Sequence, residues 1–136
     1  MNPNPKLNIE KYEVDLEENV ITFHLVEHEG TKLGEAVFKR VWGHQFSNVL
    51  SGNYVVSIKE CSPEEFHKKY TPILEEYQQC GFPFNAYKPA EFCDDIERRS
   101  LKPIIITGQY GFSGWVLCEE IRITLGGSEV SYNEIT

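Results

Sequence analysis

The chain has 136 residues and a formal net charge of −8, with 40% hydrophobic and 25% charged residues. These values indicate one globular domain, 1–136, that stabilises itself with a core, and they exclude a chain disordered throughout. The acidic balance disfavours nucleic acid and anionic membrane as partners. No apolar run approaches the roughly 18–20 residues of a membrane span, and the start lacks the pattern of a signal peptide. We therefore expect a cytosolic protein with a poorly ordered N-terminal arm over 1–9.

The first half of the chain has the patterns of β-strands. In 20–28, Ile21, Phe23 and Leu25 alternate with polar or outward residues, which is typical of a half-buried strand. A turn at 29–31 predicts a hairpin into 33–42. The β-branched content of 54–58 indicates another strand.

At Ser62 the hydrophobic period changes to that of a helix. Ser62 as N-cap, Pro63 at the first position and Glu65 three residues after the cap predict a helix over 63–80. Pro72 either kinks this helix or, with Thr71 as its cap, starts a second short one. A further helix is expected at 89–101, with Asp94–Arg98 and Asp95–Arg99 paired on its solvated face.

Strands return after Pro103. Residues 104–107 form a buried-strand pattern, 108–114 a glycine-rich connection, and 115–118 and 121–125 further strand patterns before a polar C-terminal tail at 126–136. The order strands, helix, helix, strands predicts an α+β fold. We expect a mainly antiparallel sheet with both helices packed on one face.

Neither a metal nor a cofactor is expected. Cys61, Cys80, Cys93 and Cys118 include no Cys-x-x-Cys pair, so they are interpreted as free thiols in a reducing compartment rather than zinc ligands. His24 and His28 are four positions apart, which on a strand separates them by roughly 13 Å. That separation is too large for shared ligation of one ion.

No catalytic motif is complete. His44 follows Gly43 at an expected strand end, a fair position for an acid or base, but no recognisable motif supplies its partner. Adjacent Asp94 and Asp95 point about 100° apart on a helix, which argues against paired catalytic carboxylates. We therefore lean away from an enzyme.

The glycine-rich connection carries three large rings. Gly108, Gly111 and Gly114 match neither a phosphate-binding loop nor a dinucleotide turn. Burial of the neighbouring rings in the core is the favoured interpretation. An aromatic contact surface is the alternative, and it would anchor a partner; the rings concerned are Tyr110, Phe112 and Trp115.

An acidic run precedes the first strand pattern. Its alternation with Tyr12, Val14 and Leu16 predicts one edge lined by carboxylates. These carboxylates would steer a basic protein partner; they belong to Glu10, Glu13, Asp15, Glu17 and Glu18.

Three functions are compatible with these observations. The first is a protein-binding domain, of the inhibitor or immunity type, that masks a basic partner. The alternative is an enzyme or small-ligand carrier with a pocket between sheet and helices, using His44, Tyr110 or a cysteine. The third is a subunit of a larger assembly. The oligomeric state stays open.

Overall fold

The computed structural model describes residues 7–27, 33–47, 53–77, 91–108 and 112–130. It has the α+β order that the sequence predicts, in which four strands precede two helices and three strands follow them. The elements are β1 (Leu7–Asp15), β2 (Val20–Glu27), β3 (Leu33–Ser47), β4 (Asn53–Glu60), α1 (Pro63–Tyr77), α2 (Phe92–Arg98), β5 (Lys102–Gly108), β6 (Ser113–Leu125) and β7 (Ser128–Val130).

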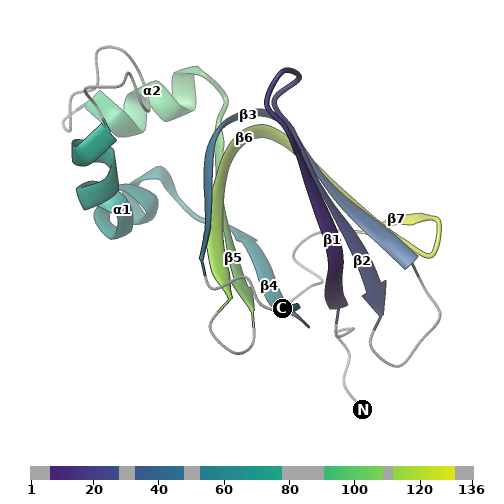
Figure 1. Cartoon of the computed structure of the whole chain (residues 1–136). Coiled ribbons are helices and arrows are strands. Elements are labelled where there is room, and N and C mark those ends of the chain that lie inside the picture. The colour runs from purple at the N-terminus through teal and green to yellow at the C-terminus, as the bar shows by residue number, and fades with distance from the viewer. Residues whose placement is uncertain (1–6, 28–32, 48–52, 78–90, 109–111, 131–136) are drawn as a thin grey trace.

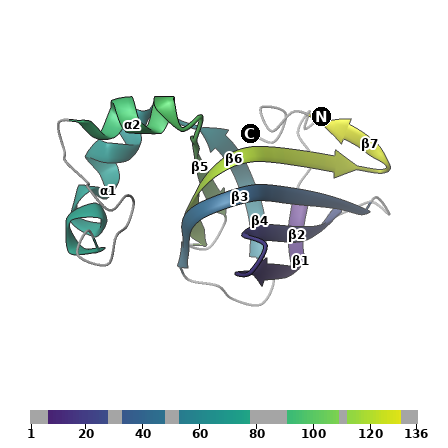
Figure 2. The same cartoon turned by 90° about the horizontal axis from the view of Figure 1, so that it is seen from above.

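The sheet closes on itself. Its strands follow the order β3-β2-β1-β4-β5-β6-β7, and β3 also pairs with β6. Six antiparallel strands therefore form a ring, and β7 adds to the end of β6. The β3–β6 register runs from Gly34 opposite Leu125 to Ser47 opposite Ser113, whereas β1 and β4 pair at only three positions. The ring is thus unequal, with a long seam at β3–β6 and a short one at β1–β4 (Figures 1 and 2).

The two longest strands, β3 and β6, bend sharply midway (Figure 1). On β3 the bend coincides with Arg40, whose φ of 52° is left-handed, and with a register shift between Val41 and Gly43. An irregularity of this kind exchanges the inward and outward positions of a strand. Phe38 faces the core before the bend and Val41 packs on it afterwards. Because of the bend, β3 and β6 pair with each other along two differently oriented parts of the ring.

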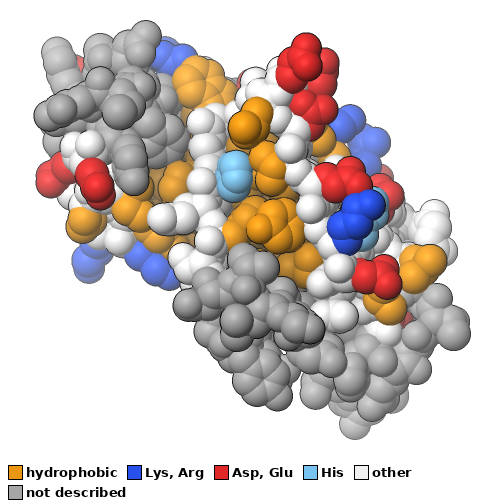
Figure 3. All heavy atoms as spheres, viewed as in Figure 1, with side chains coloured by type: hydrophobic (Ala, Val, Ile, Leu, Met, Phe, Trp, Pro, Cys, Tyr) orange, Lys and Arg blue, Asp and Glu red, His pale blue; other side chains and the backbone are white. Residues whose placement is uncertain are grey.

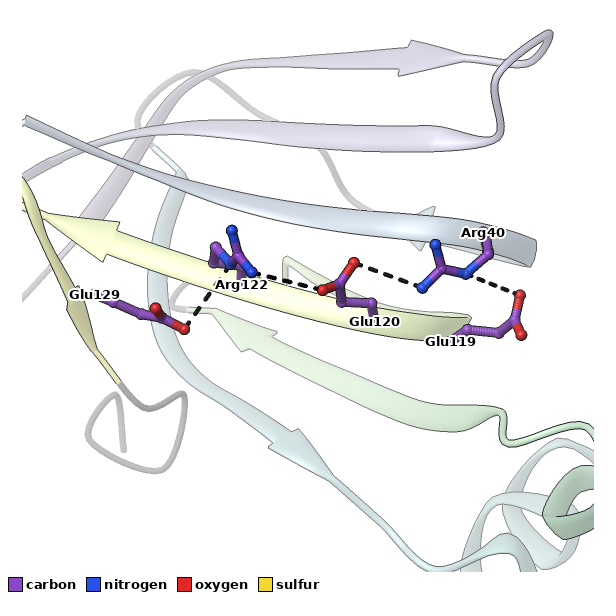
Figure 4. Close-up of polar contacts among 5 residues, drawn as sticks. All are labelled: Arg40, Glu119, Glu120, Arg122 and Glu129. Carbon is purple, nitrogen blue, oxygen red and sulfur yellow. Dashed lines mark ion pairs between the residues drawn. The ribbon is translucent and has the colours of Figure 1, made fainter.

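A chain of ion pairs runs along β6, from Arg40 of β3 to Glu129 of β7 (Figure 4). Arg40 contacts Glu119 at 3.2 Å and Glu120 at 3.6 Å, and Arg122 contacts Glu120 at 3.7 Å and Glu129 at 3.9 Å. Two arginines and three glutamates leave this surface close to neutral. Exposed pairs contribute little stability singly, so the network's main consequence is that these carboxylates are already compensated.

The interior of the ring is apolar. Alternation places Ile21, Phe23 and Leu25 of β2 inside, as the sequence predicts. The other fully enclosed side chains come from every long strand, so the core is continuous; they include Leu7, Ala36, Phe38, Ile58, Ile104, Ile106, Val116, Cys118 and Ile123.

The two helices cover one outer face of the ring, as expected (Figure 2). The predicted N-cap is confirmed, because the Glu65 N–H donates to Ser62 Oγ at 3.1 Å. Pro72 lies within α1, where Tyr70 departs from helical geometry and kinks the helix. The Cys61 N–H donates to the Pro103 carbonyl at 2.9 Å. The two ends of the helical segment therefore lie next to each other in space, at the ends of neighbouring strands.

Three local predictions need correction. Asp95 is buried at 8% exposure and pairs with Arg98, so it does not lie on a solvated face paired with Arg99. Residues 128–130, expected in the polar tail, form β7 by pairing with β6. Residues 7–9, expected in the N-terminal arm, begin β1 with Leu7 and Ile9 buried. Only for residues 7–9 does pairing with a segment distant in sequence, β4, override the local composition. β7 pairs with the neighbouring β6, and Asp95 contacts Arg98 three residues on.

Candidate binding hairpin

The predicted acidic row lies on the β1–β2 hairpin. Figure 1 shows this hairpin in dark purple, with its turn beside the bend of β3 and β6. The Asp15 carboxylate accepts hydrogen bonds from the N–H groups of Glu17 and Glu18 at 3.0 and 2.9 Å. Asn19 completes the turn in the left-handed region. Asp15 therefore shapes the turn, while Glu10, Glu13, Glu17 and Glu18 are exposed side chains.

Only part of this negative charge is compensated. Lys11 Nζ lies 2.9 Å from Glu13 Oε1, and their hydrogen bond lowers the pKa of Glu13 and raises that of Lys11. His24 Nε2 lies 3.5 Å from the same Glu13 oxygen. At this distance and angle His24 Nε2, which is buried, makes no hydrogen bond. Within the described parts of the chain, no cation pairs with Glu10, Glu17 or Glu18.

The other face of the hairpin is apolar and partly uncovered. Tyr12, Val14 and Leu16 are 38%, 37% and 77% exposed, although Tyr12 also meets core rings edge-on. Its ring centroid lies 6.1 Å from that of Phe23 and 5.4 Å from that of Phe46. Figure 3 shows hydrophobic side chains in a hollow with acidic side chains along its edge. Along β1, Tyr12 and Val14 thus alternate with Glu13 and Asp15 on the opposite face, and Leu16, Glu17 and Glu18 lie in the turn.

A second hollow lies beside His24. It has a volume of about 310 Å³, and His24 Nδ1 lies 3.9 Å from Glu35 Oε1 at its wall. Sequence reasoning did not single out Glu35, because it lies two strands away from the acidic run and only the β1–β2–β3 pairing brings it close. The lining residues are Glu10, His24, Leu25, Leu33, Gly34, Glu35 and Thr124.

The alternative of an aromatic contact surface does not fit two of its three rings. Phe112 is 2% exposed within the ring core, and Trp115 is 4% exposed beneath the helices. Buried rings offer no surface to a partner, so the favoured interpretation, that the rings enter the core, holds for both. Tyr110 lies outside the described residues. Tyr12 is the described aromatic residue that is exposed on the acidic hairpin.

Between the sheet and the helices, the described residues form a second core cluster. Phe66 stacks on Phe92 and meets Trp115 edge-on at 5.4 Å, with Leu74, Ile96, Leu101 and Leu117 packed around them. The alternative function placed a ligand pocket here, where the described residues pack as core. Burial also raises the pKa of Cys61 to about 11 and that of Cys118 to about 12, so these thiols are not activated nucleophiles. Cys61, Cys93 and Cys118 are free, and Cys80 lies outside the described residues.

His44 lies half-buried in β3, with its ring centroid 5.3 Å from that of Phe46. Within the described residues it forms no ion pair with a carboxylate. Its surroundings are those of a core-edge histidine.

The burial of His44 predicts a pH dependence of stability. Desolvation lowers its pKa below the ordinary 6.5, so between the two values the unfolded chain binds the proton more readily. The stabilising contribution is complete above pH 6.5 and is lost as pH falls through the lowered pKa. In thermal unfolding from about pH 7 to pH 5, we expect the melting temperature to fall more for the wild type than for His44→Phe. Equal slopes in this window would contradict the assignment to His44.

No described helix is both long and apolar enough to cross a membrane. In the described ranges, no three histidine, cysteine or acidic side chains are grouped so as to hold a metal ion.

Comparison with known proteins adds no relative. No family model, no curated protein and no solved structure matches this chain. The hairpin must therefore be interpreted from its own geometry and charge.

Proposed function

We propose that this chain is a protein-binding domain that masks a basic partner, in the manner of an inhibitor or immunity protein, through its β1–β2 hairpin. The observation that carries the proposal is the pairing of uncompensated carboxylates with an exposed apolar row on that hairpin. Carboxylates accelerate encounter with a basic surface, and apolar side chains hold the complex once it has formed. The exposed apolar side chains are those of Tyr12, Val14 and Leu16.

The distribution of charge favours the hairpin over the acidic surface formed by β6 and β7. Glu119, Glu120 and Glu129 are engaged by Arg40 and Arg122 (Figure 4). Residues 10–18 contain five acids and only Lys11, a net charge of −4. The electrostatic potentials of neighbouring charges add. A cationic surface is therefore attracted more strongly to the hairpin than to the glutamates that Arg40 and Arg122 already compensate.

Charge reversal tests the proposal. The variant Glu13→Lys/Glu17→Lys/Glu18→Lys leaves Asp15 in place, because Asp15 caps the turn. With a basic partner captured from the native cell, we expect its association rate at low salt to fall by about tenfold or more, since steering contributes roughly 10 to 10³. The dissociation rate should change less, because the apolar row is intact. Stopped-flow measurement over a range of ionic strength gives both rates.

A matched control separates local from total charge. Glu75, Glu76 and Glu97 are exposed on the helical layer, and their replacement by lysine changes the net charge by the same +6. This control should keep most of the wild-type association rate. Equal loss in both triple variants would show that the hairpin has no special part in binding, and unchanged rates in both would overturn the electrostatic proposal.

A further inference from the structure

The hairpin has an open strand edge as well as two contrasting faces. β1 pairs with β2 from Leu7 to Asp15, but with β4 only from Leu7 to Ile9. A bulge between Ile9 and Lys11 interrupts the strand where the second pairing stops. Over 11–15, the described parts of the chain supply no strand partner on the side of β1 that faces away from β2. Backbone N–H and C=O groups on such an edge are available for pairing with another chain.

Resting on the proposed function, we infer that the partner contributes an extended basic segment that adds to the sheet as a strand beside β1. Side chains of a strand point alternately to the two faces of a sheet. An added strand would therefore meet Tyr12 and Val14 with one set of side chains and Glu13 and Asp15 with the other. A helix or a flat surface placed on one face would reach only one of these rows. The geometry thus selects a segment in which apolar and basic residues alternate.

Charge distinguishes this occupant from a second copy of the chain. Each hairpin carries −4 over residues 10–18, so edge-to-edge pairing of two copies would bring two like-charged segments together. Charged residues and bulges on edge strands are features that oppose self-association. A basic segment meets the same edge with charges of opposite sign, which favours cross-strand pairing.

A blocked eight-residue peptide of alternating lysine and valine is the probe. It is compared with two versions, one N-methylated at every valine and the other at every lysine. Alternate N–H groups of a strand point to opposite edges, so strand addition uses only one of these two sets. We expect one methylated peptide to bind at least about tenfold more weakly, as loss of several backbone hydrogen bonds implies, and the other to bind like the parent. The peptide should also slow amide hydrogen exchange over 11–15.

The outcomes separate the inference from the function on which it rests. If the parent and both methylated peptides bind alike, or both methylated peptides weaken alike, strand addition is wrong. The proposed function still stands in that case, provided that the Glu13/Glu17/Glu18 reversal weakens the parent peptide. If the parent peptide fails to bind the wild type at low salt, or binds the reversed variant equally, both proposals fail. A dimer in sedimentation without peptide would overturn the choice of a basic segment over a second copy.

Discussion

Replacing Trp115 with alanine is expected to lower the free energy of unfolding by about 3–5 kcal/mol, the range for removal of a large buried ring. Trp115 points outward from β6 into the helical layer. Its ring centroid lies 5.4 Å from that of Phe66 and 5.9 Å from that of Tyr70, and its Nε1 donates to Gln45 Oε1 at 3.4 Å. Alanine would leave a cavity between α1 and the sheet, because the contacts of the ring with Phe66 and Tyr70 would be lost. Urea unfolding followed by circular dichroism measures the loss.

Trp42 provides the control for this change. It is 41% exposed on the same sheet, and the Arg99 guanidinium lies 4.9 Å from its ring centroid. Trp42→Ala should cost clearly less than Trp115→Ala, because much of its ring is already exposed and an exposed cation–π contact contributes only about 1 kcal/mol or less. Each variant also leaves a single tryptophan as a fluorescence reporter. A loss at Trp115 no greater than that at Trp42 would contradict the packing described for the helical layer.

Gly114→Ala is expected to destabilise the fold by about 1–3 kcal/mol, which is typical of overpacking. A Cβ at this position would lie 2.4 Å from Phe46 Cδ1 and 2.6 Å from the Gln45 carbonyl oxygen. The second atom belongs to the backbone of the β3–β6 seam and cannot move without disturbing the register. Thermal unfolding of this variant should show a lower melting temperature.

The adjacent Ser113 is exposed and pairs with Ser47 in the same register. Ser113→Ala should therefore stay within about 0.5 kcal/mol of the wild type. The Gly114 change should also displace the Phe46 ring, which contacts Tyr12. A Gly114→Ala variant as stable as Ser113→Ala would mean that β3 and β6 are farther apart than described.

Local signals predicted the elements whose formation depends on near neighbours. Ser62 caps α1 because its hydroxyl reaches the Glu65 N–H three residues away. Ile21, Phe23 and Leu25 alternate within a regular strand, so their burial could be foreseen. The α+β order followed from these elements.

The closure of the sheet could not be predicted in this way. The left-handed Arg40 and the shift after Val41 change which side chains face inward, so alternation along β3 does not extend across the bend. Asp95 is buried at 8% exposure although the spacing of charges along the helix predicts a solvated face, because that spacing does not show how α2 packs in the fold. The acidic side of the hairpin was accessible to sequence reasoning because surface charge is local. The exposure of its apolar side chains could not be predicted in this way, because it depends on β1 having no second strand partner beyond Ile9 among the described strands.

The adjacency of Cys61 and Pro103 has an evolutionary consequence. The helical segment is topologically an enlarged loop of the β4–β5 hairpin, and the cost of closing a loop grows only slowly with its length. Residues could be gained or lost between the helices over generations without moving a strand by one position. A single residue inserted into β3 before Arg40 would instead turn its side chains to the opposite face. The helical layer is therefore the place where descendants of this chain can diverge in length, and β3 is where they cannot.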